Sequence, residues 1–209
     1  MGGIAGITTA STTIINSYNE GEVIAQSTNT AEGKRIGGIA GSSNGKIINC
    51  LNKGTLKSLY ACERMGGIAG FNSGTNAIMA NCYNTGSIII EDGNGGMIGG
   101  LVGRNNSGAT IKNCYSTGTY TYPRIGYLGG INGYNYSPSA INNSYYLNIT
   151  ASKAYNGSSA NVVNCTSKTE AEMKDDSFIT LLDTDNEQSV WTKDSNNINN
   201  GYPILKWQL

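Results

Sequence analysis

The sequence predicts an all-β fold: a right-handed parallel β-helix (β-solenoid) of about five to six coils with a small mixed C-terminal cap. Three observations predict it. A glycine-rich pentad occurs five times, an asparagine signature follows each pentad, and residues 167–209 contain neither. Gly accounts for 29 of the 209 residues and Asn for 27, which suits tight turns between short strands.

The pentads and the signatures recur at nearly constant spacing. The pentads are GGIAG at 2–6, 37–41 and 66–70, GGLVG at 99–103 and GGING at 129–133. The signatures begin at Asn16, Asn49, Asn81, Asn113 and Asn143. Pentads start 35, 29, 33 and 30 residues apart, and signature asparagines lie 33, 32, 32 and 30 apart. Such a period is typical of stacked repeats, and we expect each repeat to form one coil of three short strands.

The first expected strand contains the pentad. Apolar residues flank the Gly-Gly pair three positions apart: Ile36 and Ile39, Met65 and Ile68, Ile98 and Leu101, Leu128 and Ile131. A separation of three breaks the two-residue alternation of one strand face. We therefore predict a bend at the glycine pair, with the apolar residues filling the core.

The second expected strand contains the signature. An apolar residue stands two positions before each asparagine (Ile14, Ile47, Met79, Ile111, Ile141), and Ser or Cys stands one position after it. This odd separation places Asn at a corner, where asparagines of successive coils can form a hydrogen-bonded ladder. Because Ser17 and Ser144 replace Cys50, Cys82 and Cys114, we expect a small inward residue there and free thiols.

The third expected strand follows a glycine and points Val23, Leu56, Ile88 and Tyr120 inward. Right-handed winding is the usual hand for such parallel crossovers. Val162-Val163-Asn164-Cys165 repeats the second-strand pattern and predicts a last, shortened coil.

The composition changes near residue 166, which divides the chain into a repeat domain at 1–166 and a capping segment at 167–209. The first part carries a charge of +4 (10 Lys/Arg, 6 Asp/Glu) and the second −4 (4 Lys/Arg, 8 Asp/Glu). Thr169 is an N-cap candidate before an acidic helix start at 170–174, and 177–182 is a second short helical or apolar segment. Since both tryptophans lie here, we expect this segment to cover the open end of the last coil.

These residues resemble a known family. The GGLVG pentad at 99–103, followed by Asn113-Cys114-Tyr115-Ser116-Thr117-Gly118, is similar to the GLUG-motif repeat of large bacterial surface proteins, including streptococcal IgA-specific metallopeptidases. The tail NGYPILKW at 200–207 is similar to the end of many such proteins. Asn132 in the fifth pentad and Leu51 in the second signature depart from the pattern. The resemblance implies an extracellular location on the bacterial cell surface.

We expect the chain to be a non-catalytic cell-surface module, an adhesin or stalk that binds a host glycan or an extracellular host protein. It is also expected to belong to a longer polypeptide that continues upstream of Met1. Neither part is basic enough to predict nucleic-acid binding, and no apolar run approaches the ~18 residues of a membrane span. The sequence has no His and no CxxC, so we expect no metal and no cofactor.

A carbohydrate-active β-helix enzyme, either a lyase or a hydrolase, is the alternative, and a purely structural spacer is a third possibility. Glycoside hydrolysis requires two carboxylates at a fixed separation. The coil region has six acidic residues: Glu20, Glu22, Glu32, Glu63, Glu91 and Asp92. The pairs Glu20–Glu22 and Glu91–Asp92 fit solvated turns better than a catalytic site. Serine catalysis lacks its His, so we expect no enzymatic activity.

Tyrosines provide the candidate binding residues. Nine of the 13 tyrosines lie between residues 115 and 155. Tyr115 and Tyr145 fit the repeat ladder, whereas Tyr122, Tyr134 and Tyr136 lie outside the repeat pattern. Exposed tyrosines on a rigid surface offer amphipathic contact area. These three are therefore the expected binding residues for a glycan or protein.

Overall fold

Each coil contains five short strands, and equivalent strands of successive coils pair in parallel. The computed structural model describes residues 1–28 and 34–209. The first coil contains β1 (Ala5–Ile7), β2 (Thr13–Ile15), β3 (Tyr18–Asn19), β4 (Val23–Ala25) and β5 (Arg35–Gly37). The second contains β6 (Ala40–Ser43), β7 (Lys46–Ile48), β8 (Leu51–Asn52), β9 (Leu56–Ser58) and β10 (Cys62–Gly66). The third contains β11 (Ala69–Ser73), β12 (Ile78–Ala80), β13 (Tyr83–Asn84), β14 (Ile88–Ile90) and β15 (Asn94–Gly99). The fourth contains β16 (Val102–Asn106), β17 (Thr110–Lys112), β18 (Tyr115–Ser116), β19 (Tyr120–Thr121) and β20 (Arg124–Gly129).

The fifth coil is incomplete. It contains β21 (Asn132–Asn135) and β22 (Ala140–Leu147), after which β23 (Tyr155–Gly157) pairs with β21 and β24 (Val162–Lys168) pairs with β22. The predicted shortened repeat is confirmed, because Val162 opposes Ile141 and Cys165 opposes Ser144.

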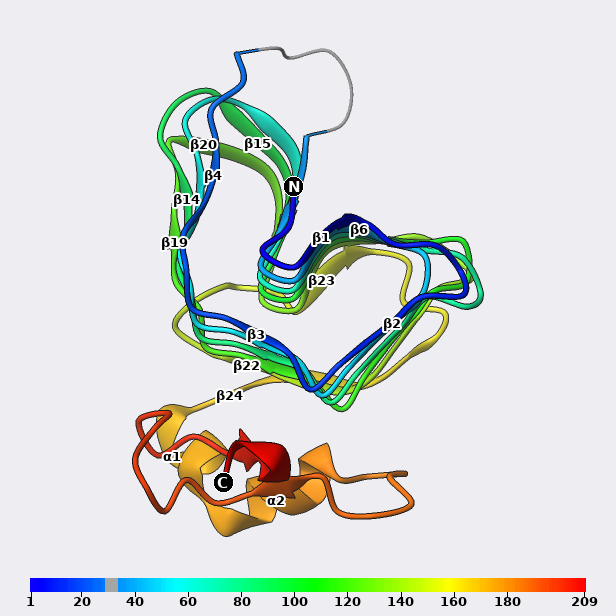
Figure 1. Ribbon diagram of the computed structural model, residues 1–209, viewed down its shortest axis with the longest axis vertical. Coiled ribbons are helices and arrows are strands. Elements are labelled where there is room, and N and C mark those ends of the chain that lie inside the picture. The colour runs from blue at the N-terminus through cyan, green and yellow to red at the C-terminus, as the bar shows by residue number, and fades with distance from the viewer. Residues whose placement is uncertain (29–33) are drawn as a thin grey trace.

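The solenoid thus has about four complete turns, fewer than the five to six expected. The reason is that the chain turns after β22, where Thr150 N donates to Leu147 O at 3.0 Å, and then enters β23 without strands equivalent to β4 and β5 in the described residues 148–154. The right-handed winding is confirmed, since the coils turn clockwise as they recede from the viewer in Figure 1.

The predicted bend at the glycine pair is confirmed, and it is concave. It separates β5, β10, β15 and β20 from β6, β11, β16 and β21, so that the coil has two lobes rather than a triangular outline (Figure 1). The second glycine of each pentad lies against the strand opposite. A Cβ at Gly38 would collide with the Asn52 side chain, and one at Gly67 would collide with Asn84. We call this line of contact the waist.

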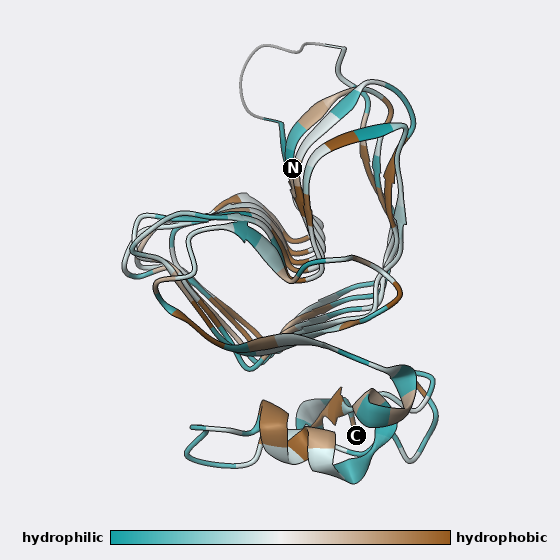
Figure 2. Ribbon diagram, turned by 180° about the vertical axis from the view of Figure 1, so that it is seen from behind, coloured by the Kyte–Doolittle hydropathy of each residue, from teal (hydrophilic) through white to brown (hydrophobic). Residues whose placement is uncertain are grey.

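The waist divides the core in two. Ile39, Ile68 and Leu101 pack with Ile47, Cys50 and their equivalents in one lobe. Ile36, Met65 and Ile98 pack with Val23, Leu56 and Ile88 in the other. The two apolar residues of each pentad therefore serve different cores, which explains their odd separation. In Figure 2 apolar residues recur at the same places in successive coils.

The predicted corner at the signature asparagine is also confirmed. Asn16, Asn49, Asn81, Asn113 and Asn143 all have positive φ, between 44° and 55°. Asn tolerates this left-handed conformation better than most residues. Its side chains form the expected ladder in part: Asn49 Nδ2 donates to Asn16 Oδ1 at 3.2 Å, and Asn143 Nδ2 donates to Asn113 Oδ1 at 3.3 Å. A second ladder, Asn19–Asn52–Asn84, runs along the waist with both bonds at 2.8 Å.

The helices form where the sequence predicts them. Thr169 caps α1 (Glu170–Lys174) through a capping box with Glu172, and Asp175 caps α2 (Asp176–Leu182). The chain then forms the antiparallel pair β25 (Trp191–Thr192) and β26 (Ile204–Leu205) and the 3₁₀ turn η1 (Lys206–Gln208).

The cap does not cover the end of the last coil, and that expectation is wrong. Instead it packs against the flank formed by β8, β13, β18 and β22 (Figure 1). The signature tyrosines Tyr83, Tyr115 and Tyr145 point outward from these strands and pack on Phe178 and Trp191 of the cap. The ends of the solenoid keep apolar residues exposed, with Ile4 at 50% and Val163 at 56%.

The cap also enters the asparagine ladder. Between Asn81 and Asn113 the ladder is bridged by Asn186, which donates to Asn81 Oδ1 and accepts from Asn113 Nδ2, both at 3.1 Å. Tyr115 Oη donates to Pro203 O at 2.6 Å, and Trp207 Nε1 donates to Asn49 O at 3.0 Å. The cap is thus fixed to the coils by hydrogen bonds as well as by apolar packing.

Candidate functional site: a basic and aromatic notch

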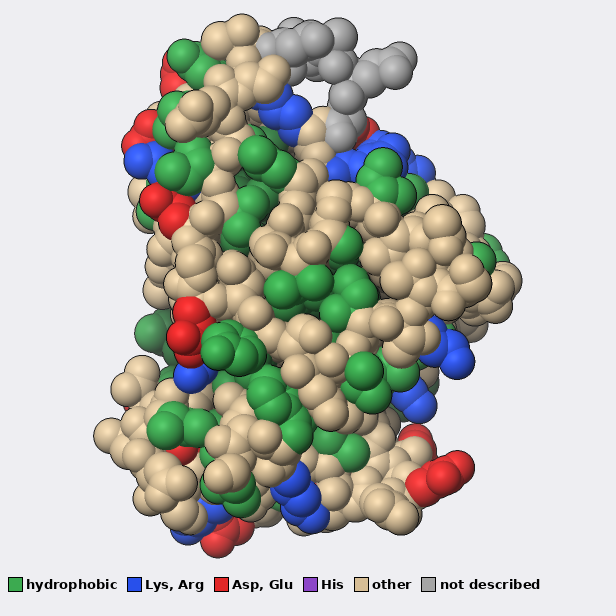
Figure 3. All heavy atoms as spheres, viewed as in Figure 1, with side chains coloured by type: hydrophobic (Ala, Val, Ile, Leu, Met, Phe, Trp, Pro, Cys, Tyr) green, Lys and Arg blue, Asp and Glu red, His purple; other side chains and the backbone are tan. Residues whose placement is uncertain are grey.

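The concave bend creates a notch on the outside of the solenoid. One wall carries the outward residues of β5, β10, β15 and β20, namely Arg35, Arg64, Met97 and Tyr127. The other wall carries those of β6, β11, β16 and β21, namely Ser42, Phe71, Arg104 and Tyr134. Each set forms one continuous ladder because the strands pair in register. Figure 3 shows basic side chains gathered at this notch, beside the sheet that begins with β1 and β6.

The two ladders touch across the notch. Arg35 Nη1 donates to Ser42 Oγ at 2.9 Å, and the ring centroids of Tyr127 and Tyr134 lie 4.9 Å apart. Between these ends, Phe71 is surrounded by three guanidinium groups, with the Cζ atoms of Arg35, Arg64 and Arg104 at 4.5, 4.7 and 5.6 Å from its ring centre. These are cation–π distances.

The notch carries an excess of positive charge. Arg64 is only 7% exposed and pairs with Glu63, whereas Arg35 and Arg104 have no carboxylate partner among the residues that the structure describes. Arg35 and Arg64 stand directly opposite each other on neighbouring strands, an unfavourable arrangement for like charges. Burial lowers the pKa of the Arg64 guanidinium; Glu63 opposes this effect, while Arg104 and Arg35 add to it.

Several guanidinium nitrogens in the notch are buried without a hydrogen-bond partner in the described part of the chain: Arg35 Nε, Arg64 Nε, Arg64 Nη1 and Arg104 Nε. Each such buried donor costs about 1–3 kcal/mol. A cluster of arginines kept at this cost marks the notch as a candidate site.

Two of the three predicted tyrosines meet at the rim of the notch. The ring centres of Tyr134 and Tyr136 lie 4.5 Å apart, and Arg104 lies 4.0 Å from the Tyr136 ring centre. Tyr127, which is 44% exposed, completes this aromatic group. Tyr122 is 39% exposed but lies between β19 and β20 and takes no part in these ring contacts. The structure therefore joins Tyr134 and Tyr136 and leaves Tyr122 apart.

Sequence reasoning missed the arginines, Phe71 and Tyr127, although a signal was present. The residue two before each pentad and the residue five after its first glycine form the two ladders. Aligning the repeats on the pentad places Arg35, Arg64 and Tyr127 in one column and Phe71, Arg104 and Tyr134 in the other. Only the concave bend shows that these two columns face each other.

The described acids of the coil region are mostly paired with basic side chains. Glu20 pairs with Lys53 at 3.6 Å and Glu91 with Lys57 at 2.6 Å, while Glu63 pairs with Arg64. Asp92 accepts from the backbone N of Gly93. Glu32 lies outside the described residues. The eight residues that form the two walls of the notch include arginines and tyrosines but no pair of carboxylates, which glycoside hydrolysis requires.

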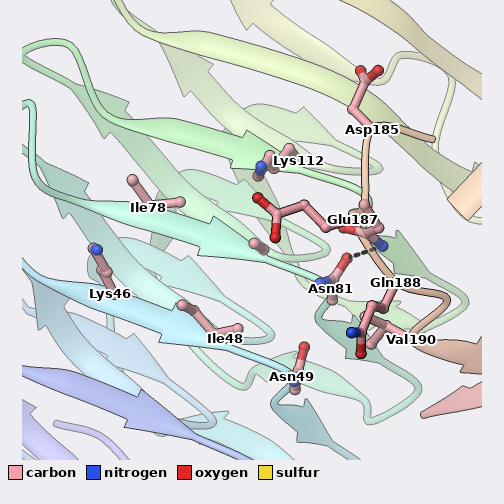
Figure 4. A pocket seen from close by; sticks show the side chains of 12 residues that line it. Lys46, Ile48, Asn49, Ile78, Asn81, Lys112, Asp185, Glu187, Gln188 and Val190 are labelled. Carbon is pink, nitrogen blue, oxygen red and sulfur yellow. Dashed lines mark hydrogen bonds between the residues drawn. The ribbon is translucent and has the colours of Figure 1, made fainter. Parts of the chain in front are cut away.

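A second recess lies between the flank of the solenoid and the cap. This cavity of about 560 Å³ is lined by Lys46 and Lys112 from the coils and by Asp185, Glu187 and Gln188 from the cap. Figure 4 shows Glu187 reaching over the strands that carry Ile78 and Lys112. Its charges are mixed, and much of its wall is the interface that holds the cap in place.

The cysteines occupy the core as predicted. All five are free thiols, and Cys50, Cys82 and Cys114 are buried in successive coils. Each of these three thiols donates to a backbone carbonyl two residues earlier, at 3.0 to 3.2 Å. Burial is the first cause of a raised pKa at Cys82, and it raises the pKa of Cys165 to about 12.

Two further properties concern the described residues. They contain no cluster of three or more His, Cys, Asp or Glu side chains that could hold a metal ion. None of the helices within 1–28 and 34–209 combines the length and apolar character needed to cross a membrane.

Comparisons with known proteins agree with this architecture. Residues 94–121, from β15 to β19, match the family model of the GLUG motif, which confirms the resemblance drawn from the sequence. No curated protein sequence matches the chain. Among solved structures, the chain is similar to a protein from Bacteroides ovatus described as a "putative immunoglobulin A1 protease", with 22% identity and a TM-score of 0.56. The similarity covers 93% of this chain and 57% of that one, so this chain spans little more than half of its length. At this identity the likeness establishes the fold: the chain is a β-solenoid that carries the GLUG motif.

Proposed function

We propose that this chain is a non-catalytic adhesive module of an extracellular, cell-surface bacterial protein, and that it binds a host glycan or host protein through the notch. The observation that carries the proposal is the rigid aromatic rim formed by Tyr127, Tyr134 and Tyr136 above a cluster of arginines. Tyr and Arg, together with Trp, are enriched among the residues that anchor binding surfaces. A structural spacer alone would need neither.

Several features support a binding role without catalysis. The acids Glu20, Glu63 and Glu91 are held by basic partners, and the sequence has no His for nucleophilic or acid–base chemistry. Neither a nucleic-acid partner nor insertion into a membrane belongs to the proposal, and neither does a cofactor. The GLUG motif and the shared fold are consistent with a segment of a larger surface protein.

The test is a screen of the chain against a glycan array and a panel of extracellular host proteins that includes immunoglobulin A1. Binding that is lost in Tyr134→Ala and Tyr136→Ala but kept in Tyr122→Ala would support the notch as the binding site. Binding that is lost only in Tyr122→Ala would place the site elsewhere and contradict the proposal. The absence of any binding, or turnover of a polysaccharide by the chain, would overturn it.

A further inference from the structure

We propose that the notch is an anion-binding site for an acidic saccharide, whose carboxylate is held by Arg64 and Arg104 while its sugar ring lies against Tyr134 and Tyr136. This inference rests on the proposed function and specifies its ligand class. It follows from three features of the notch: its charge, the geometry of its donors, and the position of its aromatic rim.

The first feature is uncompensated charge. Three guanidinium groups surround Phe71, and Glu63 is their one carboxylate partner among the described residues. Within residues 1–28 and 34–209, Arg35 and Arg104 thus lack an opposite charge, and Arg64 beside them is nine-tenths buried. A bound anion would remove this imbalance, whereas a neutral ligand would bury it further.

The second feature is the kind of donor. Arginine presents a planar fork of N–H groups that matches the two oxygens of a carboxylate, and such bidentate pairs are stronger than ordinary hydrogen bonds. The Cζ atoms of Arg35, Arg64 and Arg104 lie 4.5, 4.7 and 5.6 Å from the ring centre of Phe71, so the three forks gather around one aromatic ring. Four buried N–H nitrogens there have no acceptor in the described chain. These four N–H groups lack an acceptor within residues 1–28 and 34–209, and a carboxylate would provide one.

The third feature favours a saccharide over an acidic peptide. Tyr134 follows Arg104 in the ladder of one wall, and the Cζ of Arg104 lies 4.0 Å from the ring centre of Tyr136. Rings placed beside an anion site offer flat apolar faces to the C–H side of a sugar and a hydroxyl at their edge.

The experiment measures binding of the intact chain to four probes by calorimetry: an oligosaccharide containing glucuronate, one containing sialic acid, a matched neutral oligosaccharide, and a glutamate-rich peptide. The first two probes distinguish the two common carboxylate sugars. We expect at least one of them to bind, and the neutral oligosaccharide to bind about tenfold or more weakly.

The variants are Arg104→Gln and Arg64→Lys, the second of which keeps the charge but removes the fork. Both should weaken binding of the acidic saccharide by about tenfold or more. Lys46→Gln is the matched control, because Lys46 is exposed on β7 and lines the other recess. Melting temperatures establish that each variant is folded, and Arg104→Lys replaces Arg104→Gln if the latter unfolds.

The outcomes separate this inference from the proposed function. Preferential binding of a neutral glycan or of the peptide would overturn the acidic-saccharide site and leave the adhesive role standing. Equal weakening by Lys46→Gln would indicate non-specific attraction of anions and would also overturn it. If no probe binds and the wider screen also finds nothing, both proposals fail.

Discussion

Replacing Gly100 by Ala tests the waist, the contact on which the two-lobed coil and its notch depend. A Cβ at Gly100 would lie 2.5 Å from Ser116 Oγ and closer still to the backbone oxygen of Gly130. Real Cβ atoms essentially never approach other heavy atoms within 3.0 Å. The serine could rotate away, but the backbone of the next coil is fixed by the hydrogen bond from Gly100 N to Gly129 O at 3.1 Å.

The cost of this collision can be estimated. Overpacking a tight site costs about 1–3 kcal/mol, and a clash with backbone belongs at the upper end. For a chain of this size, about 3 kcal/mol lowers Tm by roughly 6–12 °C. The assay is thermal unfolding followed by circular dichroism, with amide hydrogen exchange to locate any local opening at coils four and five.

Gly6→Ala provides the matched control. Gly6 is the last glycine of the first pentad, and a Cβ there would meet nothing within 4 Å. Reduced freedom of the unfolded chain should make this variant neutral or more stable by up to about 1 kcal/mol. If Gly100→Ala is as stable as Gly6→Ala, the glycine does not face Ser116 and Gly130, and the reasoning about the waist is wrong.

Three further predictions concern the core, the cap and the thiols. Leu101→Asp should destabilise the fold by several kcal/mol, because Leu101 is fully buried and a carboxylate there would be unpaired. The control Leu101→Met should cost less than about 1.5 kcal/mol of stability, and an unchanged Tm for the Asp variant would refute the assigned register. Tyr115→Phe should lower the free energy of unfolding by about 1–3 kcal/mol and speed hydrogen exchange at residues 199–205, because it removes the donor to Pro203 O and the acceptor of Asn199. The control is Tyr155→Phe, since the Tyr155 hydroxyl makes no hydrogen bond in the described chain, and equal effects of the two variants would contradict the prediction. At pH 8 the native thiols should react slowly with a thiol reagent, because burial raises the pKa of Cys62 and Cys165 to about 12 and keeps both protonated. All five thiols should react after unfolding, and fast reaction of the native chain would argue against this burial.

The sequence determined the solenoid because its repeat constraints are local. Gly at the bend and Asn at the corner are required by backbone conformation and close approach, so they recur at every coil and are visible without a structure. The inward ladder of Ile39, Ile68 and Leu101 follows from them, as do the stacked thiols. The cap helices were also predictable, since Thr169 and Glu172 form a capping box within four residues.

The tertiary structure alone decided how these pieces face one another. The bend was predictable, but its concave direction was not, because Gly allows both directions and only packing against Asn52 and Asn84 selects one. The signature tyrosines recur like core residues, so nothing local shows that Tyr83 and Tyr115 point outward to hold the cap on the flank.

In the candidate site, too, some residues were predictable from the sequence and others only from the tertiary structure. Tyr134 and Tyr136 could be singled out from the sequence, whereas Arg35, Arg64 and Arg104 are far apart in the chain and were not singled out. Parallel stacking places the first two on neighbouring strands, and the concave bend turns all three toward Phe71. The sequence by itself determined the coil, because each coil repeats the same local rules. Only the folded chain decided the notch, because it depends on contacts between residues that are distant in sequence and follow no rule shared by every repeat.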